Sequence, residues 1–319
     1  MAVVVTGAAG FLGRALVAAL AADGIQVVAV DRHPKADAAD AADAADVAGG
    51  VGWVRADLLE GHAAVAAALR AADAVFHLAG RPGVRETGPA AEAARARDNV
   101  AATAAVLRQV PRPTPVVVAS SSSVYGGAAG RPSREDDPLR PLGGYARSKA
   151  VVESLCAARL AAGGAVTVVR PFTVAGEGQR PDMALARWIA AVRAGRPVRV
   201  LGSPDRSRDV TDVRDVVRAL RLAVERGVTG PLNIGTGRPH TLADLAGAVG
   251  RALGAPAELL VEPAAAVEPA ATWADTTRIR RRLGFVPVTD LDALVARQVA
   301  ASAPVARQVT GPEPALAAG

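Results

Sequence analysis

Short apolar runs rich in valine alternate with longer helical patterns in the first half of the chain. Continuous apolar runs of this length are typical of parallel strands that are buried on both faces. We predict strands at 3–6, 27–31, 53–56, 74–79, 116–120 and 166–171, and helices at 11–23, 61–72, 90–110 and 145–162. Strands and helices that alternate in this way predict an α/β fold with a doubly wound, parallel Rossmann sheet.

The pattern becomes irregular after Pro171, where isolated helices are predicted at 183–193, 213–226 and 242–253. We interpret this part as a smaller C-terminal lobe that covers the carboxyl edge of the sheet. The expected domains are 1–171 for the Rossmann domain and 172–303, mainly, for a substrate-binding lobe. Low complexity predicts a solvated loop at 36–48 and a disordered tail at 304–319.

Composition narrows the setting in which the chain works. It has no apolar stretch of the roughly 18 residues that a membrane span needs. The single cysteine, Cys156, cannot form an internal disulfide, and Met1 leads directly into a predicted strand without a signal peptide, so we expect a cytoplasmic protein. The net charge of +6 could indicate a nucleic-acid partner, but the arginines are scattered and aromatic residues make up only 3%, so we expect none.

A glycine-rich segment, TGAAGFLG at 6–13, lies between the first predicted strand and the first predicted helix. Gly7 allows a tight turn, Gly10 lets the backbone approach a pyrophosphate, and Gly13 allows close packing of helix on strand. The helix that follows presents N–H groups and the positive end of its dipole to phosphate. The segment therefore predicts a dinucleotide site.

Acidic residues follow the second and third predicted strands. A carboxylate at Asp31 would bind the adenosine ribose hydroxyls and repel a 2′-phosphate, which favours NAD over NADP. Arg32, the next residue, would favour the opposite choice. Asp57 is either an adenine contact or an ordinary solvated acid.

The chain has only two tyrosines, and one of them, Tyr145, lies four residues before Lys149 in the segment GGYARSK. Lys35 is the only other lysine, in a chain where arginine otherwise supplies the basic side chains. Residues four apart on a helix share one face, about 5–6 Å apart at Cβ. An ammonium beside a phenol lowers its pKa from about 10, so the pair is a candidate for proton transfer.

These motifs together resemble the extended short-chain dehydrogenase/reductases, and more narrowly the NAD-dependent epimerase/dehydratase family that acts on nucleotide sugars. The resemblance covers residues 2–290 and rests on TGAAGFLG, Asp31, Asp57-Leu58, FHLAG at 76–80, Asn99, SSSSVYG at 120–126 and Tyr145-Ala-Arg-Ser-Lys149. Within this family, SSSSVYG and QRPDMA at 179–184 are most similar to the UDP-glucuronate 4-epimerases.

The resemblance implies roles for particular residues. Tyr145 would be the catalytic base, Lys149 would bind the nicotinamide ribose and lower the pKa of Tyr145, and Ser121 would bind the 4-hydroxyl of the sugar. Ser122 and Ser123 stand where sugar 4,6-dehydratases carry Asp and Glu, which disfavours water elimination, and decarboxylases usually carry Glu at the position of Ser123.

The same resemblance implies two sets of binding residues. NAD would be bound by Gly7, Gly10, Phe11, Leu12, Gly13, Asp31, Arg32, Asp57, Leu58, Leu78, Ala79, Gly80, Asn99, Ser120, Tyr145, Lys149 and Pro171. The substrate would be bound by Ser121, Ser122, Ser123, Arg85, Thr173, Arg180 and Arg208, the last of which matches the diphosphate-binding arginine of the family. No metal site is expected.

Two departures from the family pattern affect the expected pocket. Ala175 replaces a tyrosine, and we expect it to leave a gap beside the sugar. Residues 265–268 replace an Arg-x-Gly-Asp stretch whose arginine holds diphosphate, so we expect one phosphate contact to be lost.

The resemblance implies an NAD-dependent nucleotide-sugar epimerase that acts at C4 of UDP-glucuronate through a 4-keto intermediate. The alternative is a UDP-glucuronate decarboxylase that forms UDP-xylose or UDP-4-keto-pentose after the same oxidation. A more distant alternative is a non-catalytic NAD-binding regulatory protein, whose mark would be the loss of the Tyr or Lys. The resemblance also implies a homodimer that pairs through the helices at 90–110 and 145–162.

Overall fold

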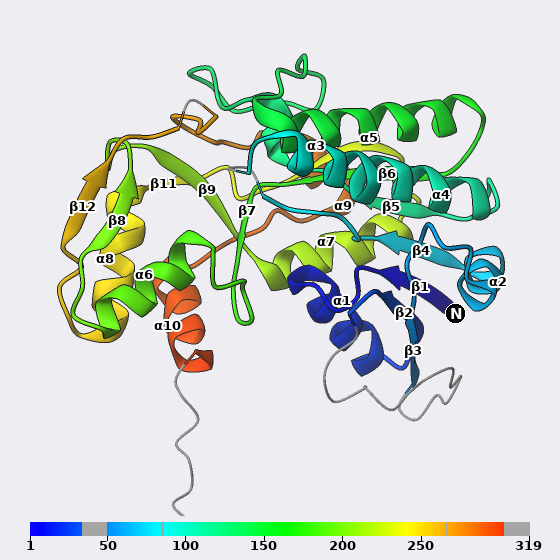
Figure 1. Cartoon of the computed structure of the whole chain (residues 1–319), viewed down its shortest axis with the longest axis horizontal. Coiled ribbons are helices and arrows are strands. Elements are labelled where there is room, and N and C mark those ends of the chain that lie inside the picture. Colours follow the sequence, from blue (N-terminus) through cyan, green and yellow to red (C-terminus); the bar gives the residue numbers. More distant parts are fainter. Residues whose placement is uncertain (34–49, 84–85, 266, 303–319) are drawn as a thin grey trace, which may run out of the picture.

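A computed structural model describes residues 1–33, 50–83, 86–265 and 267–302. Its central feature is a seven-stranded sheet in the order β10-β6-β5-β4-β1-β2-β3, and all of its strand pairs are parallel (Figure 1). The strands are β1 (Ala2–Thr6), β2 (Gln26–Asp31), β3 (Val51–Arg55), β4 (Ala74–His77), β5 (Val116–Ala119), β6 (Val166–Pro171) and β10 (Gly230–Ile234). The predicted parallel Rossmann sheet is therefore confirmed. The predictions for 36–48 and 304–319 lie outside the described residues.

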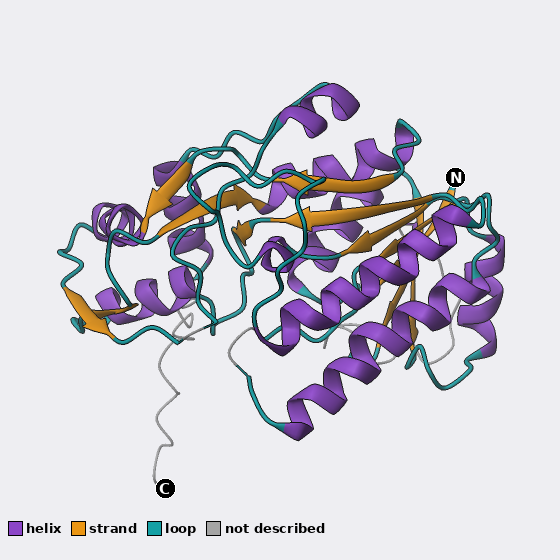
Figure 2. Cartoon of the chain, turned by 90° about the horizontal axis from the view of Figure 1, so that it is seen from above, coloured by secondary structure: helices purple, strands orange, loops and turns teal. Residues whose placement is uncertain are grey.

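Helices cover both faces of this sheet (Figure 2). On one face pack α1 (Phe11–Ala22), α7 (Val213–Glu225) and α9 (Thr277–Leu283), and on the other α2 (Ala63–Ala71), α4 (Ala102–Gln109) and α5 (Gly143–Ala161). Their apolar side chains and the valines of the strands form two buried clusters. Cys156 of α5 is fully buried in the second cluster, and burial raises the pKa of its thiol to about 12, which leaves it a packing residue.

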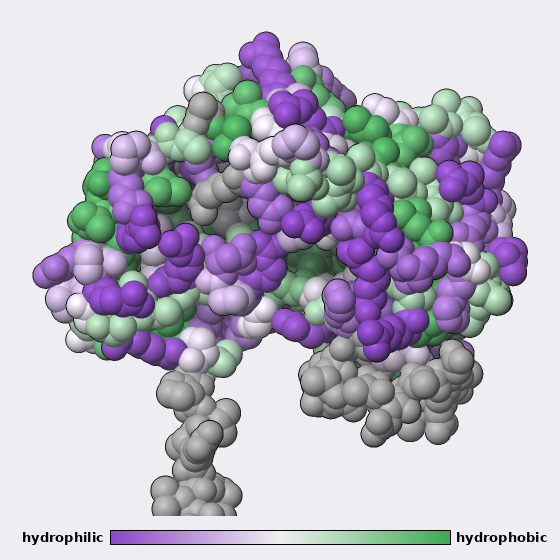
Figure 3. Space-filling view, viewed as in Figure 1, coloured by the Kyte–Doolittle hydropathy of each residue, from purple (hydrophilic) through white to green (hydrophobic). Residues whose placement is uncertain are grey.

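The second lobe has its own core. It contains the strands β7 (Thr173–Ala175), β9 (Ser207–Asp212) and β11 (Pro239–Thr241) in one sheet, and β8 (Val198–Leu201) and β12 (Leu259–Glu262) in another. The helices α6 (Ala184–Arg193), α8 (Leu242–Leu253) and α10 (Leu291–Ala301) cover them. On the face shown in Figure 3, hydrophilic side chains are widespread, and apolar patches lie both over β12, where Leu260 and Val261 are exposed, and at the upper right, over the region of α4 and α5.

The two lobes interleave along the chain. The helices α6, α7 and α8 agree with prediction to within a residue, but the strands β7 to β12 and the helices α9 and α10 were not predicted. β10 lies beyond Pro171 and yet pairs with β6 in the large sheet, while α7 and α9 pack on that sheet. A cut at residue 171 therefore does not separate the lobes.

No helix in the described part of the chain is long and apolar enough to cross a membrane.

Candidate active site

The glycine-rich turn joins β1 to α1 and is closely packed. Gly7 has a φ of 71°, and a Cβ built on it would lie 2.5 Å from the backbone nitrogen of Ala79. A Cβ on Gly13 would lie 2.1 Å from the carbonyl oxygen of Gly7. No larger residue fits at either position: the backbone just after β4 lies against Gly7, and the turn itself lies against Gly13, as a dinucleotide cradle requires. The predicted contacts Gly10, Phe11 and Leu12 cap and begin α1.

Asp31 ends β2 beside this turn. Its Oδ2 accepts a hydrogen bond from the backbone N–H of Ala9 at 3.0 Å, and its Oδ1 accepts one from the N–H of His33 at 3.0 Å. Arg32 points to another group, because its guanidinium donates to both carboxylate oxygens of Asp98 at 3.1 Å. Since Arg32 is engaged by an acid, it is a poor partner for a 2′-phosphate.

Asp57 follows β3. Its carboxylate is more buried than an ordinary solvated acid would be. Its carboxylate is 11% exposed and lies 2.7 Å from Nη2 of Arg97. It also accepts from the N–H of Leu59 at 3.0 Å. The structure thus disfavours an ordinary solvated acid.

A π-helical turn, η3 (Ala96–Ala101), between α3 (Pro89–Arg95) and α4 holds Asn99 at the centre of the site. Its Oδ1 accepts from the N–H of Arg81 at 2.6 Å, and its Nδ2 donates to Oγ of Ser148 at 2.9 Å. Asn99 therefore connects the loop after β4 to the residue before Lys149. The sequence predicted Asn99 as a cofactor contact, but it predicted one continuous helix over 90–110. The π turn was missed because such a turn leaves no distinct apolar pattern.

Lys149 is 6% exposed, and its Nζ donates to the carbonyl oxygen of Ala119 at 2.7 Å. Burial lowers the pKa of Lys149 to about 8. The ammonium lies 6.0 Å from the centroid of the Tyr145 ring, so α5 brings the two side chains to the same region, as expected for residues four apart.

Tyr145 is half-buried and forms a side-chain hydrogen bond with Ser121. Burial raises the pKa of the Tyr145 phenol, while the bond with Ser121 and the positive charge of Arg180 act in the opposite direction. The positive charge that favours the Tyr145 phenolate in the structure is that of Arg180, and the expected effect of Lys149 on this pKa stays a prediction.

The side chains of the serine run after β5, residues 120–123, have different hydrogen-bond partners. Ser121 caps the short 3₁₀ helix Ser122–Tyr125 by accepting from the N–H of Ser123 at 3.2 Å. Ser123 Oγ is buried and has no hydrogen-bond partner among the described residues. Buried hydroxyls are normally paired, so this group fits a site that a ligand completes. Ser120, expected at the cofactor, instead donates to Glu153 at 2.6 Å.

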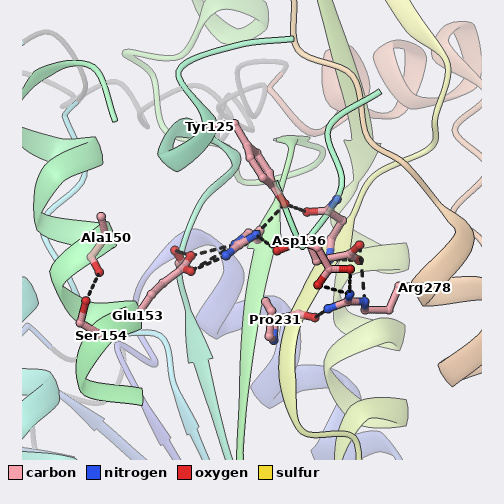
Figure 4. A network of polar contacts seen from close by, with 11 residues as sticks. Tyr125, Asp136, Ala150, Glu153, Ser154, Pro231 and Arg278 are labelled. Carbon is pink, nitrogen blue, oxygen red and sulfur yellow. Dashed lines mark hydrogen bonds and ion pairs between the residues drawn. The ribbon is translucent and has the colours of Figure 1, made fainter. Parts of the chain in front are cut away.

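Ser120 is joined through Glu153 to a buried polar network that also contains Tyr125 (Figure 4). Glu153 of α5 pairs with Arg170 of β6 at 2.6 Å, and Nη1 of Arg170 donates to the Tyr125 hydroxyl at 2.7 Å. Tyr125 in turn donates to Asn233 of β10 at 2.7 Å. Sequence reasoning missed Glu153, which lies on the buried face of α5 four residues after Lys149.

The remaining predicted contacts occupy different positions. Leu78, Ala79 and Gly80 directly follow β4, and Pro171 and Thr173 lie at the end of β6 and the start of β7. These positions lie at the carboxyl edge of the sheet, where ligands bind in such folds. Leu58 packs against the core, and Arg85 lies outside the described residues.

Two arginines of the second lobe form ion pairs with acidic side chains. Arg180 acts electrostatically on Tyr145, and its Nε donates to Asp182 at 2.8 Å. Arg208, the expected diphosphate ligand, lies 3.3 Å from the carboxylate of Glu268. The structure thus brings Arg180 to the region of Tyr145 and pairs Arg208 with an acid that sequence reasoning had not connected to it.

The expected gap at Ala175 is absent. Its side chain is fully buried in the second-lobe core, with residues such as Leu185 and Trp188. The gap was wrong because β7 directs this side chain into the lobe rather than into the site.

The residues fit an NAD site: the turn at Gly7 and Gly13 admits no side chain, and Asp31 lies beside it. Among the described residues, no group of His, Cys, Asp or Glu could hold a metal ion.

Comparisons with known proteins agree with this geometry. Residues 3–235 match the NAD dependent epimerase/dehydratase family. The UDP-glucose 4-epimerase of Mycolicibacterium smegmatis is 31% identical over 311 residues, which cover 94% of this chain and 97% of that protein. The structure of MoeE5 in complex with UDP-glucuronic acid and NAD has a TM-score of 0.82 and 37% identity, and the match covers 94% of this chain and 98% of that one.

A third similar structure is the UDP-glucuronic acid 4-epimerase from Bacillus cereus in complex with UDP-glucuronic acid and NAD. Its TM-score is 0.85 at 26% identity, and the match covers 94% of this chain and 98% of that one. The family relationship confirms the expected cofactor, NAD, and the expected enzyme class. The chain belongs to the NAD-dependent epimerase/dehydratase family, within the extended short-chain dehydrogenase/reductases.

Proposed function

We propose that the protein is a UDP-glucuronate 4-epimerase that works through a 4-keto intermediate. The observation that carries this proposal is geometric: the Lys149 ammonium lies 6.0 Å from the centroid of the Tyr145 ring, and the bond with Ser121 and the charge of Arg180 act on the same phenol. A base, a hydroxyl and a cation gathered at one point suit a sugar that gives up a hydroxyl proton and carries a carboxylate. The matched complexes with UDP-glucuronic acid support this choice of sugar.

In this mechanism Ser121 orients the 4-hydroxyl of the sugar and Tyr145 removes its proton. Bound NAD supplies a reversible hydride acceptor at C4, and Gly7, Gly13 and Asp31 would hold it. The positive charge of Arg180 stabilises the phenolate against the burial that raises its pKa. The ammonium of Lys149, 6.0 Å from the ring centroid, would add to this effect. After the sugar presents its other face, Tyr145 returns the proton to O4.

The rival reaction, decarboxylation, needs the sugar carboxylate to turn until its C–C bond aligns with the carbonyl. The buried position of Ala175 supports epimerisation, because it provides no extra space for this rotation. Ser123 offers a hydroxyl where decarboxylases usually carry Glu. The non-catalytic alternative would be marked by loss of the Tyr or the Lys. Both Tyr145 and Lys149 are present, and the ammonium lies 6.0 Å from the ring centroid, which disfavours this alternative.

The proposal is tested by incubating the purified protein with UDP-glucuronate and identifying the products by NMR. We expect UDP-galacturonate as the main product. UDP-xylose or a UDP-4-keto-pentose without UDP-galacturonate would replace the epimerase with a decarboxylase. Turnover of UDP-glucose without turnover of UDP-glucuronate would keep the C4 chemistry and change the sugar.

A further inference from the structure

We propose that Asp98 helps to determine the preference of this protein for NAD over NADP, because it occupies the guanidinium of Arg32. The two nucleotides differ by a phosphate on the adenosine ribose, and an arginine near that ribose accommodates this phosphate in NADP-binding proteins of this fold. Arg32 directly follows Asp31 at the end of β2, so it has the position for this task. The inference concerns the cofactor and does not depend on which sugar is the substrate.

Asp98 engages both terminal nitrogens of Arg32. Nη1 of Arg32 donates to Oδ1 of Asp98 and Nη2 donates to Oδ2, both at 3.1 Å. This bidentate pair uses the edge of the guanidinium that a phosphate would need. The Asp98 carboxylate is only 10% exposed and also accepts from Nη1 of Arg97 at 2.8 Å. These bonds hold the carboxylate in place on the π-helical turn η3.

Two arginines and two aspartates form one cluster at the end of β2, where the adenosine ribose is expected. Nη2 of Arg97 donates to Oδ2 of Asp57 at 2.7 Å, and Nη1 of Arg32 lies 3.6 Å from the same oxygen. The four charges balance, so the cluster does not attract an additional phosphate. Without the charge of Asp98 the cluster would be positive, and Arg32 would lack its bidentate partner.

Asp57 is poorly placed to take over the role of Asp98. Its Oδ1 accepts from the N–H of Leu59 at 3.0 Å, and its Oδ2 is bonded to Arg97. Arg32 is 45% exposed, so its guanidinium can turn toward a bound nucleotide once Asp98 loses its charge. The carboxylate of Asp31 would still repel a 2′-phosphate. The expected change is therefore a gain in NADP binding and not a reversal of the preference.

The test compares wild type with Asp98→Asn, which keeps the size of the side chain and removes its charge. Each purified protein is incubated with equal concentrations of NADP⁺ and isotopically labelled NAD⁺ until the amount of bound label is constant. Free nucleotide is removed, and mass spectrometry of the denatured protein gives the ratio of bound NADP to bound labelled NAD. We expect this ratio to rise about three- to tenfold in Asp98→Asn, the range for a charged hydrogen-bonded pair that water partly screens.

Arg32→Ala, made in wild type and in Asp98→Asn, completes a double-mutant cycle. In wild type, where Asp98 occupies Arg32, the substitution should leave the ratio within about twofold, whereas in Asp98→Asn it should remove the gain. Asp292→Asn is the matched control, because it removes the acid of an exposed pair with Arg251 in the second lobe and should not change the ratio.

Asp98→Ala is the second variant if Asp98→Asn folds poorly. An unchanged ratio in the folded Asp98 variant would overturn the inference, because Arg32 would then not reach the nucleotide. A gain that persists after Arg32→Ala would overturn it as well, because the charge of Asp98 itself, and not the release of Arg32, would then be responsible.

Discussion

Opposing influences act on the Tyr145 phenol. Burial favours its neutral form, whereas Ser121 and Arg180 favour the phenolate. Arg180 comes from the second lobe, so the pKa of Tyr145 depends on a residue that lies 35 positions away in the sequence. Tyr145, Lys149 and Ser121 could be singled out from the sequence because their motifs are local, and their roles stay predictions. The sequence could not predict the pairing of Arg208 with Glu268 or of Ser120 with Glu153, because those contacts form only when distant segments pack together.

Tyr145→Phe should reduce turnover by about 10²- to 10⁴-fold, because it removes the proton-transfer group and leaves the ring in place. Bound NAD, measured by mass spectrometry after denaturation, should stay at the wild-type level. Tyr125→Phe is the control: it alters the only other tyrosine, which bonds Asn233 in the buried network, and should affect stability more than turnover. A loss below about tenfold in Tyr145→Phe, or ~1.4 kcal/mol, would remove Tyr145 from its catalytic role.

His77 should make stability depend on pH. It is 1% exposed, its ring nitrogens bond Thr6 and Thr103, and burial together with the charge of Lys149 lowers its pKa to about 3. Between pH ~6.5 and ~3 the unfolded chain binds a proton that the folded chain excludes, so stability falls with acidification by up to about 1.4 kcal/mol per pH unit.

Urea unfolding of wild type and His77→Gln across this pH range would measure the effect. We expect a shallower pH slope in His77→Gln, whatever its absolute stability. His33→Gln alters an exposed histidine and should keep the wild-type slope. Equal slopes in all three proteins would show that His77 is not the group responsible.

At the scale of elements, α5 combines two functions on one helix. Its first turns carry Tyr145 and Lys149, and one turn further Glu153 bonds both Ser120 of the serine run and Arg170 of β6. The Glu153 pair therefore fixes the distance between the helix and the run that carries Ser121. The helix itself was predictable from its pattern, but its polar anchor was not, because a single acid on a helix is usually solvated.

Glu153→Gln should destabilise the fold by about 3–5 kcal/mol, because it leaves the Arg170 guanidinium buried without its counter-charge. Glu262→Gln, which breaks the exposed pair with Arg199, should cost about 1 kcal/mol or less. Urea unfolding of both variants measures the difference. Similar losses in the two variants would show that burial does not raise the importance of the Glu153 pair.

For the whole molecule, we predict a homodimer that pairs through α3, α4 and α5. Val151 lies on α5 and is 46% exposed, so a charge at this position would be placed directly in such an interface. Light scattering at micromolar concentration should give twice 32.2 kDa for wild type and a monomer for Val151→Glu. Val261→Glu, at a 53% exposed valine on β12, should remain dimeric. A wild-type monomer would contradict the prediction.

The late position of β10 in the chain has a consequence for biosynthesis. Ribosomes release a chain from its N-terminus, so β6 stays at the open border of the large sheet until residues 230–234 have emerged. Throughout that interval the unpaired backbone of β6 is available to other nascent chains. Chains that are arrested within the second lobe should therefore aggregate rather than form a soluble nucleotide-binding fragment.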